Sequence, residues 1–285
     1  MAYLSDSDWR LVVKAVENAG GIRQTGGTAG RLISDAITKA QFSSRSEAGR
    51  YAAQQRWKGH VKATPEEAIG ALAQGQNVSL EGGKQVFTLI EKIGEFAEQQ
   101  KDAGKKVETL DLCKVSIPGT NLFCGDNIGK ERIEMPQLSG KPTAGSKGDK
   151  LPKDAKGRIN IGEAFQEALT KEGIETVDGE VPASSLRASQ KELIGDKVAG
   201  IMEEIASGKM DSVKDTIFVS KDGYVVDGHH RWAAKIGLDM RDGGLGDIKM
   251  KVKVINLGIE EVLAKANAFS EEMGIPPQKA VSESS

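Results

Sequence analysis

The sequence is poor in aromatic residues and contains no long hydrophobic run. Aromatic residues make up 5% of its 285 positions and hydrophobic residues 38%. This composition favours one well-filled core plus a less compact remainder over a single large core. No apolar stretch approaches the roughly 20 residues that a bilayer-spanning helix needs. The first residues, Met1 to Asp6, lack the basic and apolar segments of a signal peptide. We therefore expect a soluble protein with no membrane partner.

Cysteine is also scarce, because only Cys113 and Cys124 occur. Two cysteines cannot complete a zinc site by themselves. We expect two ordinary buried or half-buried thiols in a reducing cytoplasm. An excess of charge of one sign is missing as well: 39 basic residues against 41 acidic ones give a net charge of -2. The whole chain therefore has no field that would attract nucleic acid or an anionic membrane, although a local basic patch is compatible with this balance.

The first 60 residues predict short helices separated by glycine-rich breaks. One of these helices combines basic and aromatic side chains, namely Arg50, Arg56, Lys58, Tyr51 and Trp57. Such a helix could contact nucleic-acid phosphates. The alternative is a solvated helix whose two aromatic rings pack on neighbouring apolar surface.

The next segment predicts helices and a hairpin. Thr64 and Glu67 form a capping-box pattern at the start of one helix, and apolar residues at helical spacing predict a longer helix from Gly83 to Phe96. Residues 109–117 and 120–123 predict a β-hairpin with Pro118-Gly119 as its turn. From Ser139 to Asn160 the composition shifts to Gly, Lys, Pro and Ser, which is typical of a linker.

After this segment, helix and strand patterns alternate. They predict helices at 161–169, 191–206, 229–236 and 260–273. They also predict a strand or extended entry at 181–186, a hairpin of 216–219 and 224–226 around Asp222-Gly223, and a last strand at 248–255. We therefore expect an α+β protein, divided into a short-helix N-terminal region (1–62), a helix plus β-hairpin module (63–138), a flexible linker (139–160), an α+β domain (161–277) and a disordered tail (278–285).

The turn Asp227-Gly228-His229-His230-Arg231 carries the chemistry of interest. Gly228 lets the backbone bend sharply, and a helix that starts there directs unpaired N–H groups and a positive dipole end at a ligand. His229 and His230 add donors expected to titrate near neutrality, and Arg231 adds a forked cation suited to phosphate. Asp227 is a carboxylate that could accept a hydroxyl proton or bind Mg²⁺. The alternative is that Asp227 caps the helix and one histidine is a satisfied core residue.

The segment from Val181 to Ile236 resembles the ParB/sulfiredoxin superfamily, whose compact α+β domain binds nucleotide phosphates. The stretch Tyr224-Val225-Val226-Asp227-Gly228-His229-His230-Arg231-Trp232-Ala233 is similar to the corresponding turn of ADP-dependent free-serine kinases. Gly228, His230 and Arg231 also match the Gly-x-His-Arg turn of sulfiredoxins. Lys197 stands where sulfiredoxins carry a nucleotide-contacting lysine.

This resemblance implies ADP or ATP binding, with Mg²⁺ as a companion ion, and phosphoryl transfer to a hydroxyl such as that of serine. Lys197, Gly228, His230 and Arg231 would hold the phosphates. Asp227 or its neighbour His229 would activate the hydroxyl, and Asp227 would contact the metal.

Two departures limit the comparison. Gln190 stands where the serine kinases place a catalytic glutamate, and an amide cannot act as a base. Glu192, two positions on, could substitute if the local register shifts. His229 stands where sulfiredoxins carry their cysteine, so sulfinic-acid reduction is not expected.

A second resemblance concerns biological context. Residues 44–53, 121–124 and 135–138 resemble segments of proteins from tailed phages of actinobacteria. The competing function is then a virion or head-assembly protein whose domain is a non-catalytic binding module, with phage head or other virion proteins as partners. This context places the protein in the host cytoplasm or in the virion. A ParB-like DNA-binding protein or nuclease is the third reading, which the net charge and the lack of an obvious helix-turn-helix disfavour.

Overall fold

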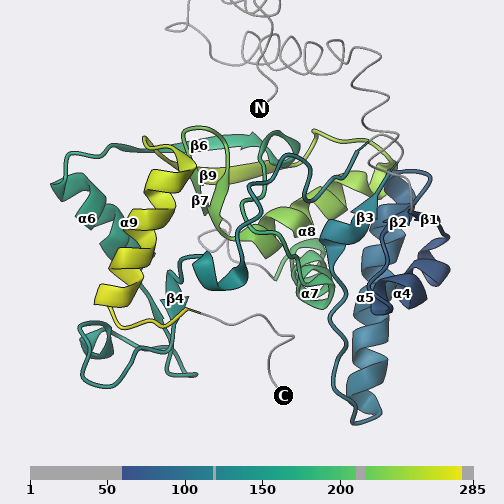
Figure 1. Ribbon diagram of the computed structural model, residues 1–285, viewed down its shortest axis with the longest axis horizontal. Coiled ribbons are helices and arrows are strands. Elements are labelled where there is room, and N and C mark those ends of the chain that lie inside the picture. The colour runs from purple at the N-terminus through teal and green to yellow at the C-terminus, as the bar shows by residue number, and fades with distance from the viewer. Residues whose placement is uncertain (1–59, 118–119, 210–215, 278–285) are drawn as a thin grey trace, which may run out of the picture. The chain divides into compact units, whose positions relative to one another are not determined.

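A computed structural model describes residues 60–117, 120–209 and 216–277 (Figure 1). The chain divides into two units, Met1–Lys58 and Gly59–Ser285, and everything described here belongs to the second. The predictions for the N-terminal helices, the basic-aromatic segment and the tail 278–285 concern residues outside the described ones.

The first part of this unit is a small parallel sheet with two helices. Its strands follow the order β1-β2-β3 and are all parallel. The elements are β1 (Val61–Lys62), α4 (Pro65–Ala73), β2 (Val78–Ser79), α5 (Gly83–Asp102) and β3 (Val115–Ser116). The predicted capping box at α4 is confirmed, because the Thr64 side chain accepts from Glu67 N and the Glu67 carboxylate accepts from Thr64 N. The predicted helix from Gly83 is confirmed as α5, which extends to Asp102.

A four-stranded mixed sheet forms the centre of the second part. Its order is β6-β9-β7-β8, with β7 parallel to β9 and the other pairs antiparallel. The strands are β6 (Thr176–Pro182), β7 (Ile217–Ser220), β8 (Val225–Asp227) and β9 (Lys249–Ile255). The predicted hairpin around Asp222-Gly223 is confirmed as β7 and β8, and Gly223 adopts a φ of 83° in the turn. The predicted last strand is confirmed as β9.

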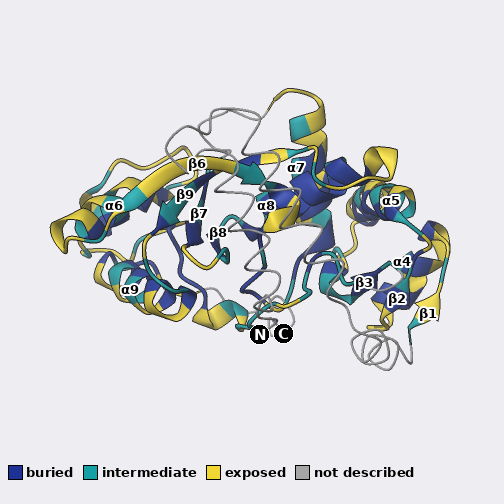
Figure 2. Cartoon of the chain, turned by 90° about the horizontal axis from the view of Figure 1, so that it is seen from above, coloured by how far each residue is buried: buried dark blue, intermediate teal, exposed yellow. Residues whose placement is uncertain are grey.

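Helices cover both faces of this sheet, because successive strand residues point to opposite sides. Ile217 and Val219 of β7 join the core that includes residues of α5, α7 and α8, whereas Phe218 packs with residues of α6 and α9. The ring of Phe218 lies 6.2 Å from that of Phe165 in an edge-on arrangement. Seen from above, β7 and β8 are largely buried, whereas the edge strand β6 and the outer helix surfaces are exposed (Figure 2). The helices are α6 (Gly162–Lys171), α7 (Gly195–Ala206), α8 (His229–Asp239) and α9 (Ile259–Glu272). The expected α+β class is thus confirmed.

The segment 139–160 differs from the flexible linker that its composition predicts. It forms β4 (Ser139–Gly140), a 3₁₀ turn at Gly148–Lys150 and β5 (Ile159–Asn160), and β4 pairs antiparallel with β5. Its backbone also bonds to the end of α9: Thr143 N donates to Gly274 O at 2.7 Å and Gly148 N to Met273 O at 3.1 Å. Backbone hydrogen bonds, which composition does not reveal, therefore hold this polar segment in place.

The predicted hairpin at 109–123 is wrong in its strands. Ile117 and Thr120 do form an antiparallel bridge with two backbone hydrogen bonds. However, β3 pairs in parallel with β2 instead. Residues 121–125 form a turn because Asn121 Oδ1 accepts from Phe123 N and Cys124 N. Cys113 and Cys124 form a disulfide across this loop, so the expectation of two free thiols is also wrong.

The predicted helix at 191–206 begins later than its sequence pattern indicates, at Gly195. The preceding residues are extended and bonded to another segment: Leu112 N donates to Leu193 O, and Gly195 N donates to Leu110 O at 2.8 Å. Because these residues form backbone hydrogen bonds with 110–112, residues 191–194 are not part of the helix. None of the described helices is long and apolar enough to cross a membrane.

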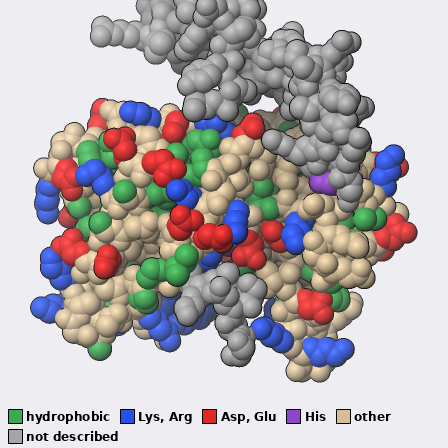
Figure 3. All heavy atoms as spheres, in the orientation of Figure 1, with side chains coloured by type: hydrophobic (Ala, Val, Ile, Leu, Met, Phe, Trp, Pro, Cys, Tyr) green, Lys and Arg blue, Asp and Glu red, His purple; other side chains and the backbone are tan. Residues whose placement is uncertain are grey.

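The surface carries both charge signs. On the face shown in Figure 3, Lys and Arg side chains are interspersed with Asp and Glu side chains.

Candidate functional site

The turn at the start of α8 has the local structure that its sequence predicts. β8 ends at Asp227, Gly228 follows with a φ of 96°, and α8 begins at His229. A Cβ atom on Gly228 would lie 2.3 Å from Ile217 Cγ2, so only glycine fits. Among the described residues, no side chain caps the helix at Gly228. The first N–H groups of α8 and its positive dipole end are therefore suited to an anion.

Asp227 and Arg231 form an ion pair across this turn. Arg231 Nη2 lies 3.1 Å from Asp227 Oδ2, and Arg231 Nη1 donates to Thr216 O at 3.0 Å. The Arg231 and Asp227 side chains are 24% and 38% exposed. Arg231 thus ties the turn to the residue before β7 while its guanidinium still reaches solvent.

His229 is buried beneath the turn. Its Nε2 accepts hydrogen bonds from Ser189 N at 3.2 Å and Gln190 N at 3.4 Å, and it lies 3.0 Å from Ser189 Oγ. These two N–H donors assign the proton of the neutral ring to Nδ1. Burial lowers the pKa of His229 to about 3, with smaller contributions from His230 and Arg132. His229 therefore positions the chain at Ser189, and the expectation that it titrates near neutrality is wrong.

His230 lies between the starts of α7 and α8. Its Nε2 accepts a hydrogen bond from Ile194 N, the residue before α7, at 3.3 Å. Burial lowers the pKa of His230 to about 3, and the positive charges of Arg132 and Lys197 act in the same direction. The neutral ring has one N–H, on Nδ1, left to donate. The expectation of a near-neutral pKa is wrong here too.

Arg132 lies at the centre of the charged groups, and sequence reasoning missed it. It begins a 3₁₀ turn at Arg132–Glu134, and its Nη1 donates to Gln190 Oε1 at 3.0 Å. Burial lowers the pKa of Arg132, whereas the carboxylates of Asp227 and Glu192 act in the opposite direction. The segment around Arg132 reaches the site because Lys130 forms a parallel bridge with Gln190.

Lys197, in the first turn of α7, adds a further cation. Partial burial lowers the pKa of Lys197, and the positive charges of Arg132 and Arg158 lower it further. Arg158 belongs to the segment that was expected to be a linker. Like charges gathered in this way are unfavourable without an anion, so the cluster is suited to a negatively charged ligand.

Gln190 is locked into the fold. Its side chain accepts from Arg132 through Oε1 and donates from Nε2 to Glu192 O at 2.5 Å, and the residue is 1% exposed. It therefore acts as a support for Arg132.

Glu192 is half-buried and faces a second carboxylate. Burial raises the pKa of Glu192, and the negative charge of Asp111 raises it further. Burial likewise raises the pKa of Asp111, although its Oδ1 accepts from Cys113 N and Leu193 N, both at 2.9 Å. A carboxyl group with a raised pKa is a stronger base than an ordinary one once it is ionised.

The structure thus brings most of the predicted site residues together. The charge of Arg132 interacts with the carboxylates of Asp227 and Glu192 and lowers the pKa of both Lys197 and the neutral His230. His229 lies beneath them in the core. Within residues 60–117, 120–209 and 216–277, no group of three or more His, Cys, Asp or Glu side chains is arranged to hold a metal ion. Asp227, whose side chain is 38% exposed, could offer one carboxylate ligand to a metal ion.

No protein-family model, no curated protein and no solved structure matches this chain.

Proposed function

We propose that the protein binds the phosphates of ADP or ATP at the start of α8. The observation that supports this most is the gathering of Arg132, Lys197 and Arg231 beside an uncapped helix start at Gly228. Three cations and a row of free N–H groups are complementary to a di- or triphosphate. The neutral His230 contributes one further donor, Nδ1–H.

The proposal includes transfer of the terminal phosphoryl group to a hydroxyl such as that of serine. The hydroxyl oxygen attacks the terminal phosphorus, the bond from that phosphorus to the nucleotide oxygen breaks, and the hydroxyl proton passes to a carboxylate. Glu192 is the favoured acceptor, because its pKa is raised and Asp227 is engaged by Arg231. Mg²⁺, bound by Asp227 and the phosphates, would neutralise part of the phosphate charge.

Calorimetric titration of the full chain with ADP and ATP, with and without Mg²⁺, tests the binding. Lys197→Ala should weaken binding about tenfold, since it removes one phosphate contact. Lys171→Ala is the matched control: it removes an exposed lysine from the last turn of α6 and should change nothing. No binding at millimolar nucleotide, or equal effects of the two variants, would refute the proposal.

Transfer is tested separately, with labelled ATP or ADP and free serine or protein as the acceptor. Glu192→Gln should abolish transfer while leaving nucleotide affinity within a few-fold. Retained transfer would remove Glu192 from the mechanism.

The second candidate is a non-catalytic binding module in a phage virion or head-assembly protein. It is favoured by Gln190, whose amide is wholly engaged with Arg132 and Glu192 where a catalytic glutamate would be needed. Nucleotide binding without transfer, together with detection of the chain in purified particles, would support this candidate; absence from particles would count against it.

A further inference from the structure

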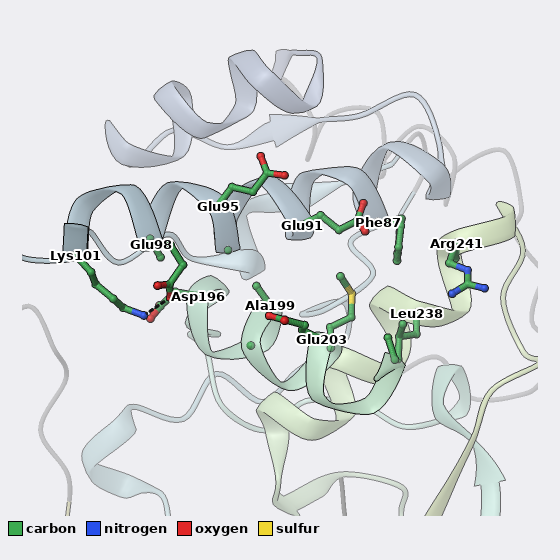
Figure 4. Close-up of a pocket in the computed structure, with 15 residues that line it drawn as sticks. Phe87, Glu91, Glu95, Glu98, Lys101, Asp196, Ala199, Glu203, Leu238 and Arg241 are labelled. Atoms are coloured by element: carbon green, nitrogen blue, oxygen red, sulfur yellow. Dashed lines mark hydrogen bonds and ion pairs between the residues drawn. The ribbon is translucent and has the colours of Figure 1, made fainter. Parts of the chain in front are cut away.

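A groove separate from the phosphate-binding turn lies between α5 and α7. It encloses about 640 Å³. Figure 4 shows the two helices side by side, with Glu98, Ala199 and Glu203 between them and Glu95 pointing to the side of α5 away from α7. Its floor is apolar and comes from the three helices α5, α7 and α8: Phe87, Ala97, Ala199, Met202 and Leu238. The helices approach closely here, since a Cβ on Gly94 would lie 3.2 Å from Ala199 Cβ.

The rims of the groove are acidic. Five carboxylates line it, Glu91, Glu95 and Glu98 from α5 and Asp196 and Glu203 from α7, against two cations, Lys101 and Arg241. Figure 4 shows Lys101 beside Glu98 and Asp196 at one end and Arg241 at the other. The middle of the groove is therefore left with carboxylates alone.

Three of these carboxylates are outside the ion pairs formed among the described residues, although Glu91 and Glu95 act on the nearby Lys92 through their charge. Lys101 is paired with Glu98 at 2.6 Å. Within the part of the chain that the structure describes, Glu91, Glu95 and Glu203 form no ion pair, and all three residues are exposed. An apolar floor between unpaired negative rims is complementary to a ligand with one apolar ridge and positive flanks.

The dimensions favour a helix as that ligand. The α5 wall extends from Phe87 to Lys101, which corresponds to about 21 Å of helix axis or about four turns. The charged groups are spread along both rims over this length. A small molecule would instead be recognised by a few polar groups that converge on one point.

We infer that this groove docks a basic amphipathic helix of a partner protein. The apolar ridge of the helix packs on Phe87, Ala199, Met202 and Leu238, and its Lys or Arg side chains pair with Glu91, Glu95 and Glu203. The groove and the proposed phosphate site both use α7, because this helix lines the groove and also carries Lys197.

The test uses the full chain and three labelled synthetic helices of about 15 residues. The first has Leu at positions i, i+4, i+7 and i+11 with Lys and Arg on both flanks; the second replaces the basic residues with Glu; the third is a scrambled version of the first. Fluorescence anisotropy should show saturable, salt-sensitive binding of the first helix alone.

Two neighbouring substitutions on α7 provide the matched control. Glu203→Lys reverses a charge on the groove rim, whereas Glu204→Lys makes the same charge change at an exposed position that does not line the groove. Glu203→Lys should weaken binding about tenfold, and Glu204→Lys should leave it within about twofold. Gly200→Trp should block the groove, because Gly200 lines it and a Cβ there meets no atom within 4 Å.

Circular dichroism and thermal unfolding confirm that each variant is folded. The inference is overturned if the basic helix does not saturate at several hundred micromolar, if the scrambled helix binds equally well, or if Glu203→Lys and Glu204→Lys weaken binding to the same extent. The last outcome would indicate general attraction to an acidic surface.

Discussion

Arg132 Nη1 donates a hydrogen bond of 3.0 Å to Gln190 Oε1, across 58 positions of sequence. Gln190 in turn donates to the carbonyl of Glu192. This chain of contacts holds the central cation of the candidate site at a fixed place. It also gives a structural role to an amide that stands where a carboxylate was expected.

Gln190→Glu tests that role. The new carboxylate can still accept from Arg132, but it neutralises part of the positive charge offered to phosphate. We expect nucleotide affinity to fall about tenfold by titration calorimetry while the thermal unfolding temperature shows that the fold persists. Gln190→Ala, which removes one acceptor of the half-buried Arg132 guanidinium, should lower both affinity and stability by about 1–3 kcal/mol in each case. An unchanged affinity in both variants would show that Arg132 does not contact the nucleotide.

Gly228→Ala should destabilise the fold strongly for two reasons. A φ of 96° is strained for alanine, and the added Cβ would lie 2.3 Å from Ile217 Cγ2. Gly223→Ala is the control for strain alone: its φ is 83°, and a Cβ there meets nothing within 4 Å. Urea unfolding should give a loss of about 1 kcal/mol for Gly223→Ala and clearly more for Gly228→Ala. Equal losses would mean that the neighbouring β7 yields to the added methyl group.

The buried histidine makes stability depend on pH in the acid range. The pKa of His229 is about 3 in the fold, compared with 6.5 for the ordinary side chain, so the unfolded chain binds more protons between these values. Stability from this group is complete above pH 6.5 and decreases as the pH falls towards 3. Between pH 7 and pH 5 the loss from His229 should be about 2 kcal/mol, and His230, whose pKa is also about 3, should add a similar amount.

Urea unfolding at pH 7 and pH 5 measures this loss. His229→Gln, which keeps an acceptor for the backbone N–H groups but does not titrate in this range, should reduce the pH dependence. If the stability of His229→Gln depends on pH as steeply as that of the unaltered chain, groups other than His229 cause the dependence.

Asp227→Asn should have a small effect on the stability of the fold and a large effect on the proposed phosphoryl transfer. The pair with Arg231 is partly exposed, so its loss should cost at most about 1 kcal/mol in urea unfolding. The proposed phosphoryl transfer should fall much further, because the proposed Mg²⁺ ligand is lost. Transfer at an unchanged rate would show that Asp227 serves only to hold the turn.

Much of the fold follows from local patterns. The Thr64–Glu67 capping box, the Asp222-Gly223 hairpin and the strand–glycine–helix turn at Gly228 each depend on residues within a few positions of one another, and each is confirmed. The start of α7 was misjudged because Leu193 and Gly195 are bonded to Leu112 and Leu110, which lie far away in the sequence.

The site was less predictable than the fold for the same reason. Arg132 belongs to no motif, and only the bridge between Lys130 and Gln190 brings it beside the turn. The low pKa values of His229 and His230 result from burial by segments distant in sequence, which the residue types alone cannot indicate.

The contact between the segment 139–160 and the end of α9 has a consequence for the order of folding during synthesis. Thr143 Oγ1 and N both bond to Gly274 O, a separation of 131 residues. At the usual speed of translation a ribosome needs roughly 10 s to make a stretch of that length. Residues 143–148 therefore emerge long before their partners exist, and this side of the protein can close only after Met273 and Gly274 have left the ribosome.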